Sequence, residues 1–557
     1  MKTVVLSSLE RTTPEECNES ARIQWVEGFR NEAISFQISY KGQRDRALIV
    51  RVRADVDIKM YDELFLPVYH TKTCGNARVP KTGIYPDILK SRQLNPETYI
   101  TTSYWSNTNV PIGDNQLYLL SDCWKTLWFT VNENQKILDA GEYSVTVEFF
   151  DADKDGKKVH EETVKVKILD EKLPPQKLMY TNWLHCDCIC DYHRVEMFSD
   201  EFFKILENYV RVAATHGMNM VLLPAFTPPL DTPVGKERMT AQLVKVTRTN
   251  GKYTFDFSLM KRYIDVCKRA GAKYFEHCHL FTQWGATSAP KIIATVNGKE
   301  KKIFGWETEA SSKEYTRFLR QYITELKEFL AEQKLSKKVL FHISDEPTDE
   351  TLPTYLKALN VVKDLFKDCM TGDALSHYEV YEKSAVKYPI VVTNSIDAFK
   401  GCKDLWTYYT GNDTEWGMSN RLLSTPPEWN RMIGVQMYGY RVKGFLHWAY
   451  NFYYGPLSHG FSDPKLDVCG FGPLGAGAGN IVYPENDGTV LPSMRQKVFL
   501  EGINDQRALD LLEKRKGREF CEQLIEKYFG KINFKNGTES PKHLLDFRHE
   551  VNIEILK

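Results

Sequence analysis

Residues 339–347 read Val-Leu-Phe-His-Ile-Ser-Asp-Glu-Pro, and this stretch decides the fold. The apolar, β-forming run stops at two adjacent carboxylates, Asp345 and Glu346, and Pro347 prevents the strand from continuing. Helical patterning resumes at Thr351, so the unit is a strand, an acidic turn and a helix. In a parallel α/β barrel the carboxyl ends of the strands face the substrate. The doublet is therefore either a pair of working carboxylates or an acidic helix cap, because Asp and Glu also favour helix starts.

Strands and helices alternate on both sides of this unit. The first strand is expected at 177–185 and the last at 444–450, with eight strands in all. The other expected strands are 218–224, 273–279, 339–344, 369–373, 390–394 and 405–410, and the clearest helices are 200–216, 257–269, 311–333 and 352–366. This alternation predicts an α/β catalytic domain over residues 173–490, a (β/α)8 TIM-type barrel.

Residues 1–172 are predicted to form an all-β sandwich domain, because runs of β-formers are separated by Gly, Asn and Asp turns. Two of these runs, 143–150 and 163–169, predict a hairpin. Its turn, at 151–162, matches the calcium-loop pattern D-x-D-x-D-G-x5-E. The flanks are strands rather than the helices that such a loop needs, so we interpret it as a polar turn. Residues 491–557 are expected to form a helical extension that packs on the barrel.

The composition is that of a soluble globular protein. Lys and Arg together count 73, as do Asp and Glu, so no net field favours nucleic acid or an anionic membrane. No run approaches the roughly 18 apolar residues of a membrane span, and the N-terminus shows no apolar segment of signal-peptide length. Twelve cysteines are scattered without the density of a disulfide scaffold. We therefore expect a cytoplasmic protein with reduced thiols that binds neither nucleic acid nor membrane.

The run Cys186-Asp187-Cys188-Ile189-Cys190 suggests a metal site. On a strand, alternate residues point to one face, but zinc sites usually combine a C-x2-C pair with a distant second pair. The sequence has no second pair of this kind, so buried, inert cysteines are the better interpretation, and no metal site is predicted. The Gly-rich segment 470–480 has no Lys-Ser/Thr and is expected to be a loop near the barrel mouth rather than a phosphate cradle.

Polar and aromatic side chains follow several of the expected strands at their carboxyl ends. Convergence of such residues on one rim is what a ligand pocket requires, although each of them alone is more often structural. The candidates for contacting a substrate are His185, Asp231, Arg238, His279, Gln283, Trp284, Trp306, Tyr408, Tyr409, Trp448 and Asn451.

Longer segments across the barrel carry a family resemblance. They include residues 279–285 (His-Leu-Phe-Thr-Gln-Trp-Gly), 341–347 (Phe-His-Ile-Ser-Asp-Glu-Pro) and 444–448 (Gly-Phe-Leu-His-Trp), together with 181–185, 226–232, 242–244, 304–306, 419–421 and 481–484. In these segments the chain resembles glycoside hydrolase family 123, which comprises β-N-acetylgalactosaminidases with an N-terminal β-sandwich and a (β/α)8-type catalytic domain. One departure is that relatives tend to read Gly-Asp-Gly or Gly-Asp-Ala where this chain has Gly477-Ala478-Gly479.

The resemblance implies a retaining exo-hydrolase that needs no cofactor and releases terminal β-linked N-acetylgalactosamine from a glycan or glycoconjugate. In substrate-assisted catalysis the 2-acetamido carbonyl is the nucleophile, and an oxazolinium intermediate forms. Carried onto this chain, Glu346 is the acid/base, and Asp345 orients and stabilises the acetamido group. The alternatives are a broader β-N-acetylhexosaminidase and a non-catalytic carbohydrate-binding protein on the same fold.

Overall fold

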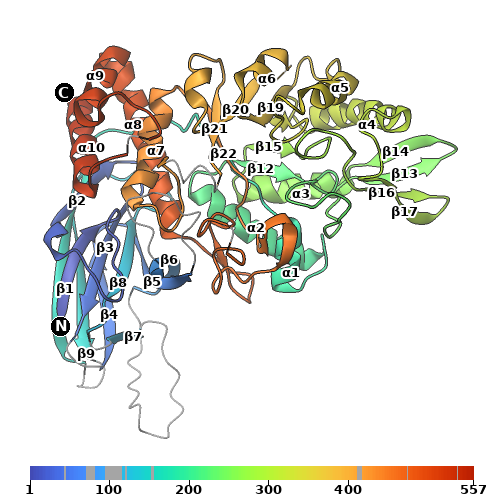
Figure 1. The fold of residues 1–557 in the computed structure, drawn as a ribbon. Coiled ribbons are helices and arrows are strands. Elements are labelled where there is room, and N and C mark those ends of the chain that lie inside the picture. Colours follow the sequence, from blue (N-terminus) through green and yellow to red (C-terminus); the bar gives the residue numbers. More distant parts are fainter. Residues whose placement is uncertain are drawn as a thin grey trace, which may run out of the picture. The chain divides into compact units, whose positions relative to one another are not determined.

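The structure is a computed structural model that describes residues 1–42, 46–69, 82–94, 116–119, 122–151, 156–384, 386–410, 417–472, 474–535 and 537–557. Its contacts divide the chain into two compact units. The first unit comprises residues 1–176, 419–439 and 491–557, and the second comprises residues 177–418 and 440–490. Figure 1 shows the elements of both units.

The first unit contains the predicted β-sandwich. One five-stranded sheet has the order β1-β3-β8-β5-β6, and the other has the order β2-β10-β9-β4-β7. Side chains from both sheets share one apolar core, in which Phe36 stacks on Phe129 and Tyr40 contacts Phe149 of the opposite sheet. The strands are β1 (Lys2–Ser7), β2 (Trp25–Phe29), β3 (Ile34–Lys41), β4 (Arg46–Ala54), β5 (Ile58–Val68), β6 (Gly83–Arg92), β7 (Gln116–Leu119), β8 (Lys125–Val131), β9 (Gly141–Asp151) and β10 (Lys158–Leu169).

The hairpin expected near residue 150 is confirmed, because β9 and β10 pair antiparallel over most of their length. Residues 152–155 of the calcium-like turn lie outside the described residues. The strand pairing on both sides nevertheless supplies no helix of the kind that an EF-hand loop needs.

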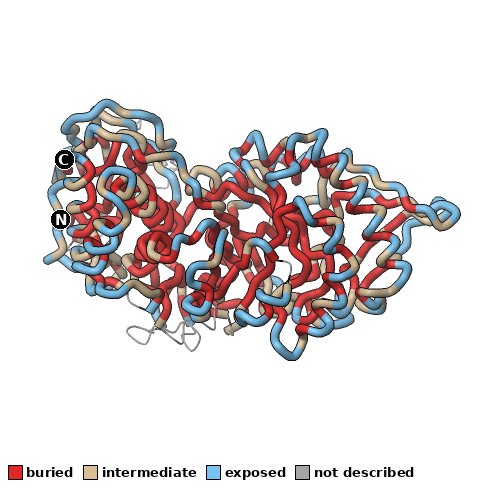
Figure 2. Tube along the Cα trace, turned by 90° about the horizontal axis from the view of Figure 1, so that it is seen from above, coloured by how far each residue is buried: buried red, intermediate tan, exposed pale blue. Residues whose placement is uncertain are grey.

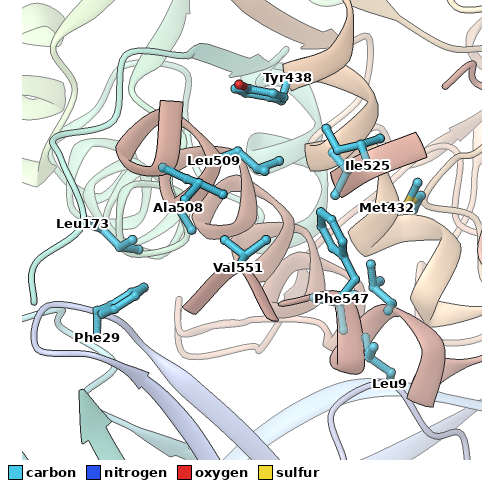
Figure 3. Packing of buried hydrophobic residues seen from close by; sticks show 14 of the residues in the cluster. Leu9, Phe29, Leu173, Met432, Tyr438, Ala508, Leu509, Ile525, Phe547 and Val551 are labelled. Atoms are coloured by element: carbon cyan, nitrogen blue, oxygen red, sulfur yellow. The ribbon is translucent and has the colours of Figure 1, made fainter. Parts of the chain in front are cut away.

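Four helices complete the first unit: α7 (Pro427–Gly439), α8 (Met494–Lys516), α9 (Arg518–Phe529) and α10 (Pro541–Leu556). Figure 3 shows how Leu509, Ile525 and Val551 from these helices pack in one cluster that also includes Phe29 of the sandwich. The structure thus groups residues 491–557 with the sandwich strands, whereas the sequence led us to expect them on the barrel. The domain boundaries at 172 and 490 remain a prediction.

The second unit is a closed barrel of parallel strands in sequence order, which confirms the predicted (β/α)8 fold. Its strands are β11 (Met179–Asn182), β12 (Met220–Leu223), β15 (Tyr274–His277), β18 (Val339–Phe341), β19 (Met370–Leu375), β20 (Tyr388–Val392), β21 (Trp406–Tyr408) and β22 (Gly444–His447). Nearly all of these strand residues are buried, as expected for a parallel sheet covered on both faces. In Figure 2 the buried residues, in red, run through the interior, and the exposed residues, in pale blue, lie on outer turns.

Local sequence signals explain the barrel helices. The side chain of Ser199 accepts a hydrogen bond from Phe202 N at the start of α2 (Asp200–Thr215), and Ser312 accepts one from Tyr315 N at the start of α4 (Lys313–Glu332). Gly271, with φ of 120°, ends α3 (Ser258–Ala270) in the left-handed conformation that favours glycine. The remaining helices of this unit are α1 (Cys186–His193), α5 (Leu352–Val362) and α6 (Tyr378–Lys383).

Two features of the barrel unit differ from the sequence interpretation. The cysteine-rich run was considered as a strand but begins helix α1, because His185 ends the extended segment. A small sheet, with the order β14-β13-β16-β17, also extends from the barrel (Figure 1). Its strands, which the sequence analysis did not separate, are β13 (Lys245–Thr249), β14 (Lys252–Asp256), β16 (Ile292–Val296) and β17 (Lys299–Phe304).

The loop after β22 contains short paired strands, namely β23 (Tyr454–Gly455) with β24 (His459–Phe461). Residues Tyr483–Pro484 (β25) and Val490–Leu491 (β26) form a second two-stranded pair. Among the helices within the described ranges, none is both long enough and apolar enough to cross a lipid bilayer.

Gly444 tests the packing of the closed barrel. A Cβ added there would lie 2.0 Å from a ring carbon of Trp406 on the neighbouring strand. We expect Gly444→Ala to lower the free energy of unfolding by about 1–3 kcal/mol, because overpacking forces the ring or the backbone to move. Gly83→Ala is the matched control, since its methyl group would meet only a Tyr85 carbon at 3.9 Å. Thermal unfolding followed by circular dichroism measures both variants, and equal melting temperatures would contradict the expectation.

Candidate active site

The acidic doublet lies directly after β18, at the carboxyl end of the barrel. Asp345 and Glu346 are both partly exposed, so neither side chain is sequestered in the interior. Glu346 has φ of 46°, a left-handed conformation that is uncommon for a residue other than glycine. The Tyr408 hydroxyl, at the end of β21, donates a hydrogen bond of 2.6 Å to Glu346 Oε1. One carboxylate of the pair is therefore oriented by the end of another barrel strand, β21.

Asp345 is partly exposed to solvent, but its carboxyl group lies in surroundings of low dielectric constant. Burial of its carboxyl raises its pKa well above the ordinary value, and the neighbouring Glu346 charge raises the pKa further. The charge of His342 acts in the opposite direction. A carboxyl group in such a setting keeps its proton to a higher pH than an exposed one.

Trp284 forms an exposed edge beside the doublet. Its backbone N–H donates a hydrogen bond of 2.9 Å to the Asp345 carbonyl, and its side chain is 51% exposed. Its φ is 57°, which is strained for a bulky residue, and Gly285 follows with φ of 129°. This strained turn joins the backbone of Trp284 to that of Asp345 and leaves the aromatic ring exposed to solvent.

A buried ion pair joins α1 to the loop after β12. Arg238 donates from Nε and Nη2 to the two carboxylate oxygens of Asp187, each at 2.8 Å. Arg238 Nη2 also lies 3.3 Å from His185 Nδ1, and burial together with the Arg238 charge lowers the pKa of His185 to about 4. Asn451 clamps the His185 backbone, accepting from its N–H at 2.9 Å and donating to its carbonyl at 3.0 Å. His185 Nε2 lies 3.1 Å from the Trp448 carbonyl.

A second group of hydrogen bonds fixes the loop after β12. Gln283 Oε1 accepts from the Asp231 backbone N–H at 2.7 Å, and Asp231 Oδ1 accepts from Leu457 N at 3.0 Å. Asp231 has φ of 43°, and burial raises the pKa of its carboxyl. Trp306 donates from Nε1 to the Lys236 carbonyl at 2.9 Å. These contacts tie together three loops at the carboxyl end of the barrel.

The structure thus brings the predicted residues to one end of the barrel but divides them by exposure. Asp231, Asp345, Glu346, Trp284, Trp306 and Trp448 are accessible, at least in part, and so is Arg238, although its side chain is only 7% exposed. The predicted residues that are buried are His185, His279, Gln283, Tyr408, Tyr409 and Asn451. Direct contact with a substrate remains a prediction for every one of them. For His185, Arg238, Gln283 and Asn451, the hydrogen bonds above are those of residues that hold loops in place.

Sequence reasoning overlooked a charged cluster inside the barrel. His342 Nε2 lies 2.9 Å from Glu276 Oε2, and His342 Nδ1 lies 3.8 Å from Asp373 Oδ1. Trp183 Nε1 donates to Glu276 Oε2 at 3.0 Å, and the Tyr355 hydroxyl donates to Asp373 Oδ2 at 2.7 Å. The sequence did contain a signal for this cluster, namely polar residues at inward positions of strands that are otherwise apolar.

Ala478, at the position where the family resemblance implies an acidic residue, is buried, with 1% of its surface exposed. Its carbonyl lies 3.0 Å from His447 Nε2. An aspartate at this position would therefore need a polar partner in the interior.

The cysteine interpretation is confirmed for the run in α1. Cys186, Cys188 and Cys190 are buried, and burial raises the pKa of each thiol. Within the part of the chain that the structure describes, no three His, Cys, Asp or Glu side chains are grouped so as to hold a metal ion.

The model of the glycoside hydrolase 123 catalytic domain matches residues 183–512, which include the barrel strands from β12 to β22 and the acidic doublet. The chain belongs to glycoside hydrolase family 123. A solved family 123 glycoside hydrolase from Clostridium perfringens, studied for glycolipid glycan hydrolysis, is similar over 100% of this chain and 97% of its own length, with a TM-score of 0.71 and 12% identity. At that identity the similarity shows a shared fold.

A family 5 glycoside hydrolase from Bacteroides vulgatus is similar over 60% of this chain and 67% of its own length, with a TM-score of 0.32 and 11% identity. Among curated proteins, none matches this chain. Family membership makes the chain a glycoside hydrolase with a glycan substrate.

The ion pair between Arg238 and Asp187 is expected to hold this family 123 site together. Both side chains are 7% exposed, so Arg238→Met leaves a buried carboxylate without its partner. We expect the free energy of unfolding to fall by about 3–5 kcal/mol. The control is Arg211→Met, which removes an exposed pair with Glu207 and should cost at most about 1 kcal/mol.

Adding Asp187→Asn to Arg238→Met removes the unpaired charge and should restore part of the lost stability. Urea unfolding followed by tryptophan fluorescence measures all four proteins. If Arg238→Met were as stable as Arg211→Met, the ion pair would not be the element that fixes these loops.

Proposed function

We propose that this family 123 protein is a retaining exo-β-N-acetylgalactosaminidase that uses the 2-acetamido group of its substrate as the nucleophile. The observation that carries the proposal is the adjacent pair Asp345 and Glu346, partly exposed at the carboxyl end of β18. Two carboxylates that serve an external nucleophile must lie on opposite faces of the sugar ring, some distance apart. Neighbouring residues suit a reaction in which only one of them handles the glycosidic proton.

In the first step, the acetamido carbonyl oxygen bonds to the anomeric carbon while the bond to the leaving oxygen breaks. Glu346 gives its proton to the leaving oxygen, and an oxazolinium ion results. Asp345 accepts the acetamido N–H and balances the positive charge that develops on the new ring. In the second step, Glu346 removes a proton from water, which attacks the anomeric carbon and reopens the ring with net retention.

The surroundings of the pair support these roles. The hydrogen bond from Tyr408 orients Glu346, and the raised pKa of Asp345 favours one shared proton in the free enzyme. An acetamido N–H that donates to Asp345 stabilises its ionised form and thereby shifts the proton to Glu346. The exposed ring of Trp284 offers a surface on which an apolar sugar face or aglycone stacks.

The proposed substrate is a glycan or glycoconjugate with a terminal β-linked N-acetylgalactosamine. The similar Clostridium perfringens enzyme is described by its hydrolysis of glycolipid glycans, so glycolipids are the first class to examine. Ala478 favours keeping a second candidate, a carbohydrate-binding protein without turnover, because relatives carry an acidic residue at that position.

A panel of chromogenic β-GalNAc, β-GlcNAc and β-Gal substrates tests the proposal. We expect the wild type to cleave only the 2-acetamido sugars, with β-GalNAc fastest, and to release the β-anomer first in an NMR time course. Glu346→Gln should reduce turnover by at least about a hundredfold, since it removes the proton donor and base. The matched control is Glu350→Gln, an exposed acid four residues further on, which should retain full turnover.

Two outcomes would overturn parts of the proposal. Cleavage of β-Gal at a similar rate would remove the argument for substrate assistance, because that sugar has no acetamido group. Glycan binding without cleavage of any sugar would favour the binding protein. A thiazoline analogue of the intermediate separates the roles further, since its affinity should fall sharply in Asp345→Asn.

A further inference from the structure

His342 is a buried, titratable residue that lies three positions before Asp345 in the sequence. It lies between two carboxylates, Glu276 on β15 and Asp373 on β19, and the side chains of all three are at most 1% exposed. Both carboxylates are held by other donors: Trp183 bonds to Glu276, and Tyr355 and the Ile343 N–H bond to Asp373. The carboxylates therefore cannot turn away from the imidazole.

This arrangement favours a charged imidazole. A neutral His342 would leave two carboxylates close together in a dry interior without a counter-charge, which is costly. Burial alone would lower the pKa of His342, but the adjacent carboxylates of Asp373 and Glu276 raise it to about 9. The imidazole is then a cation throughout the neutral range.

The other histidines of this region stay neutral. His279 stacks on His342 with ring centroids 4.6 Å apart, and burial together with the His342 charge lowers its pKa well below the ordinary value. His277 lies 2.7 Å from the Tyr322 hydroxyl, and burial lowers its pKa to about 4. Several titratable groups surround His342. Glu276, His277 and His279 come from β15 and the segment after it, and Asp373 comes from β19. Asp345, from the segment after β18, and Tyr355, from α5, complete the set. The charge of Glu346, the next residue in the chain, raises the pKa of Asp345.

We propose that His342, held as a buried cation by Glu276 and Asp373, is a positioning residue that lowers the proton affinity of Asp345, so that the substrate's acetamido N–H can ionise it. The proposal rests on the proposed function, because it explains how Asp345 can become charged when the acetamido group binds. Burial and Glu346 both press a proton onto Asp345, and the His342 charge opposes them. Without that cation, Asp345 would hold a proton more tightly and would balance an oxazolinium ion less readily.

Direct titration of the two groups tests this inference without any substrate. Protein labelled with 13C at aspartate carboxyls and 15N at histidine rings is titrated by NMR, with Asp345→Asn and His342→Gln spectra assigning the signals. We expect the His342 ring to remain an imidazolium at pH 7, and the Asp345 midpoint to rise by about one pH unit in His342→Gln. His277→Gln is the matched control, because it removes a buried neutral histidine and should leave the Asp345 midpoint unchanged.

A second variant guards against misfolding of His342→Gln. Glu276→Gln keeps the shape of its side chain but removes one of the two charges, so the His342 midpoint should fall by about one pH unit or more. A neutral His342 ring at pH 7 in the wild type would overturn the inference. An unchanged Asp345 midpoint in folded His342→Gln would overturn it equally.

An activity assay distinguishes the failure of this inference from the failure of the proposed function. On a β-GalNAc substrate, the acid limb of the kcat/KM profile should move to higher pH in His342→Gln, since the loss of the cation raises the proton affinity of Asp345. A merely structural role would lower activity equally at every pH. If the wild type cleaves no 2-acetamido sugar, the proposed function fails, while the titrations still decide the charge of His342 and its effect on Asp345.

Discussion

All eight barrel strands run in the same direction, and this constraint determines where chemistry takes place. Parallel hydrogen bonding in a closed ring brings every carboxyl end to one rim, so residues separated by more than a hundred positions meet there. Tyr408 reaches Glu346 across two intervening strands, β19 and β20, and Asn451 holds the backbone of His185. The contact between Asn451 and His185 depends on the closure of the ring, because it joins the segment after the last strand, β22, to the segment after the first, β11.

Closure also creates a problem of buried polarity. The rim and the interior of this barrel contain guanidinium, imidazole and carboxylate groups that are costly to bury unless they are paired. The structure pairs them in two ways. Near the rim, Arg238 and Asp187 bind each other through both carboxylate oxygens. Deeper inside, His342 lies between Glu276 and Asp373. Both arrangements pair buried charges with each other, whereas Asp345 and Glu346 remain partly exposed next to the backbone of Trp284.

The architecture was largely predictable, because periodicity and strand ends are local signals. The eight strands were placed from apolar runs, and even the short, weak run near residue 370 forms β19. The acidic doublet was found because Pro347 ends its strand. The start of α1 was missed because Cys-Asp-Cys-Ile-Cys alternates like a strand, whereas the extended segment ends at His185. The tail was expected on the barrel because sequence order says nothing about which core a helix joins.

The interior of the site was harder to predict, for a physical reason. The sequence shows that Arg238 and His279 are polar, but it does not show whether a polar residue contacts solvent, a substrate or another residue. Arg238 is fully engaged by Asp187, whereas both ring nitrogens of His279 lack a partner among the described residues. Such differences depend on which strands are neighbours, and that becomes known only when the barrel is closed.

The left-handed backbone at Glu346 implies a compromise between durability and activity. Holding a side chain other than glycine at φ of 46° costs on the order of 1 kcal/mol. Glycine would adopt the same turn without that penalty but would carry no carboxyl group. Selection for heat resistance alone would therefore favour glycine at this position, and under the proposed mechanism that protein would be more stable but inactive.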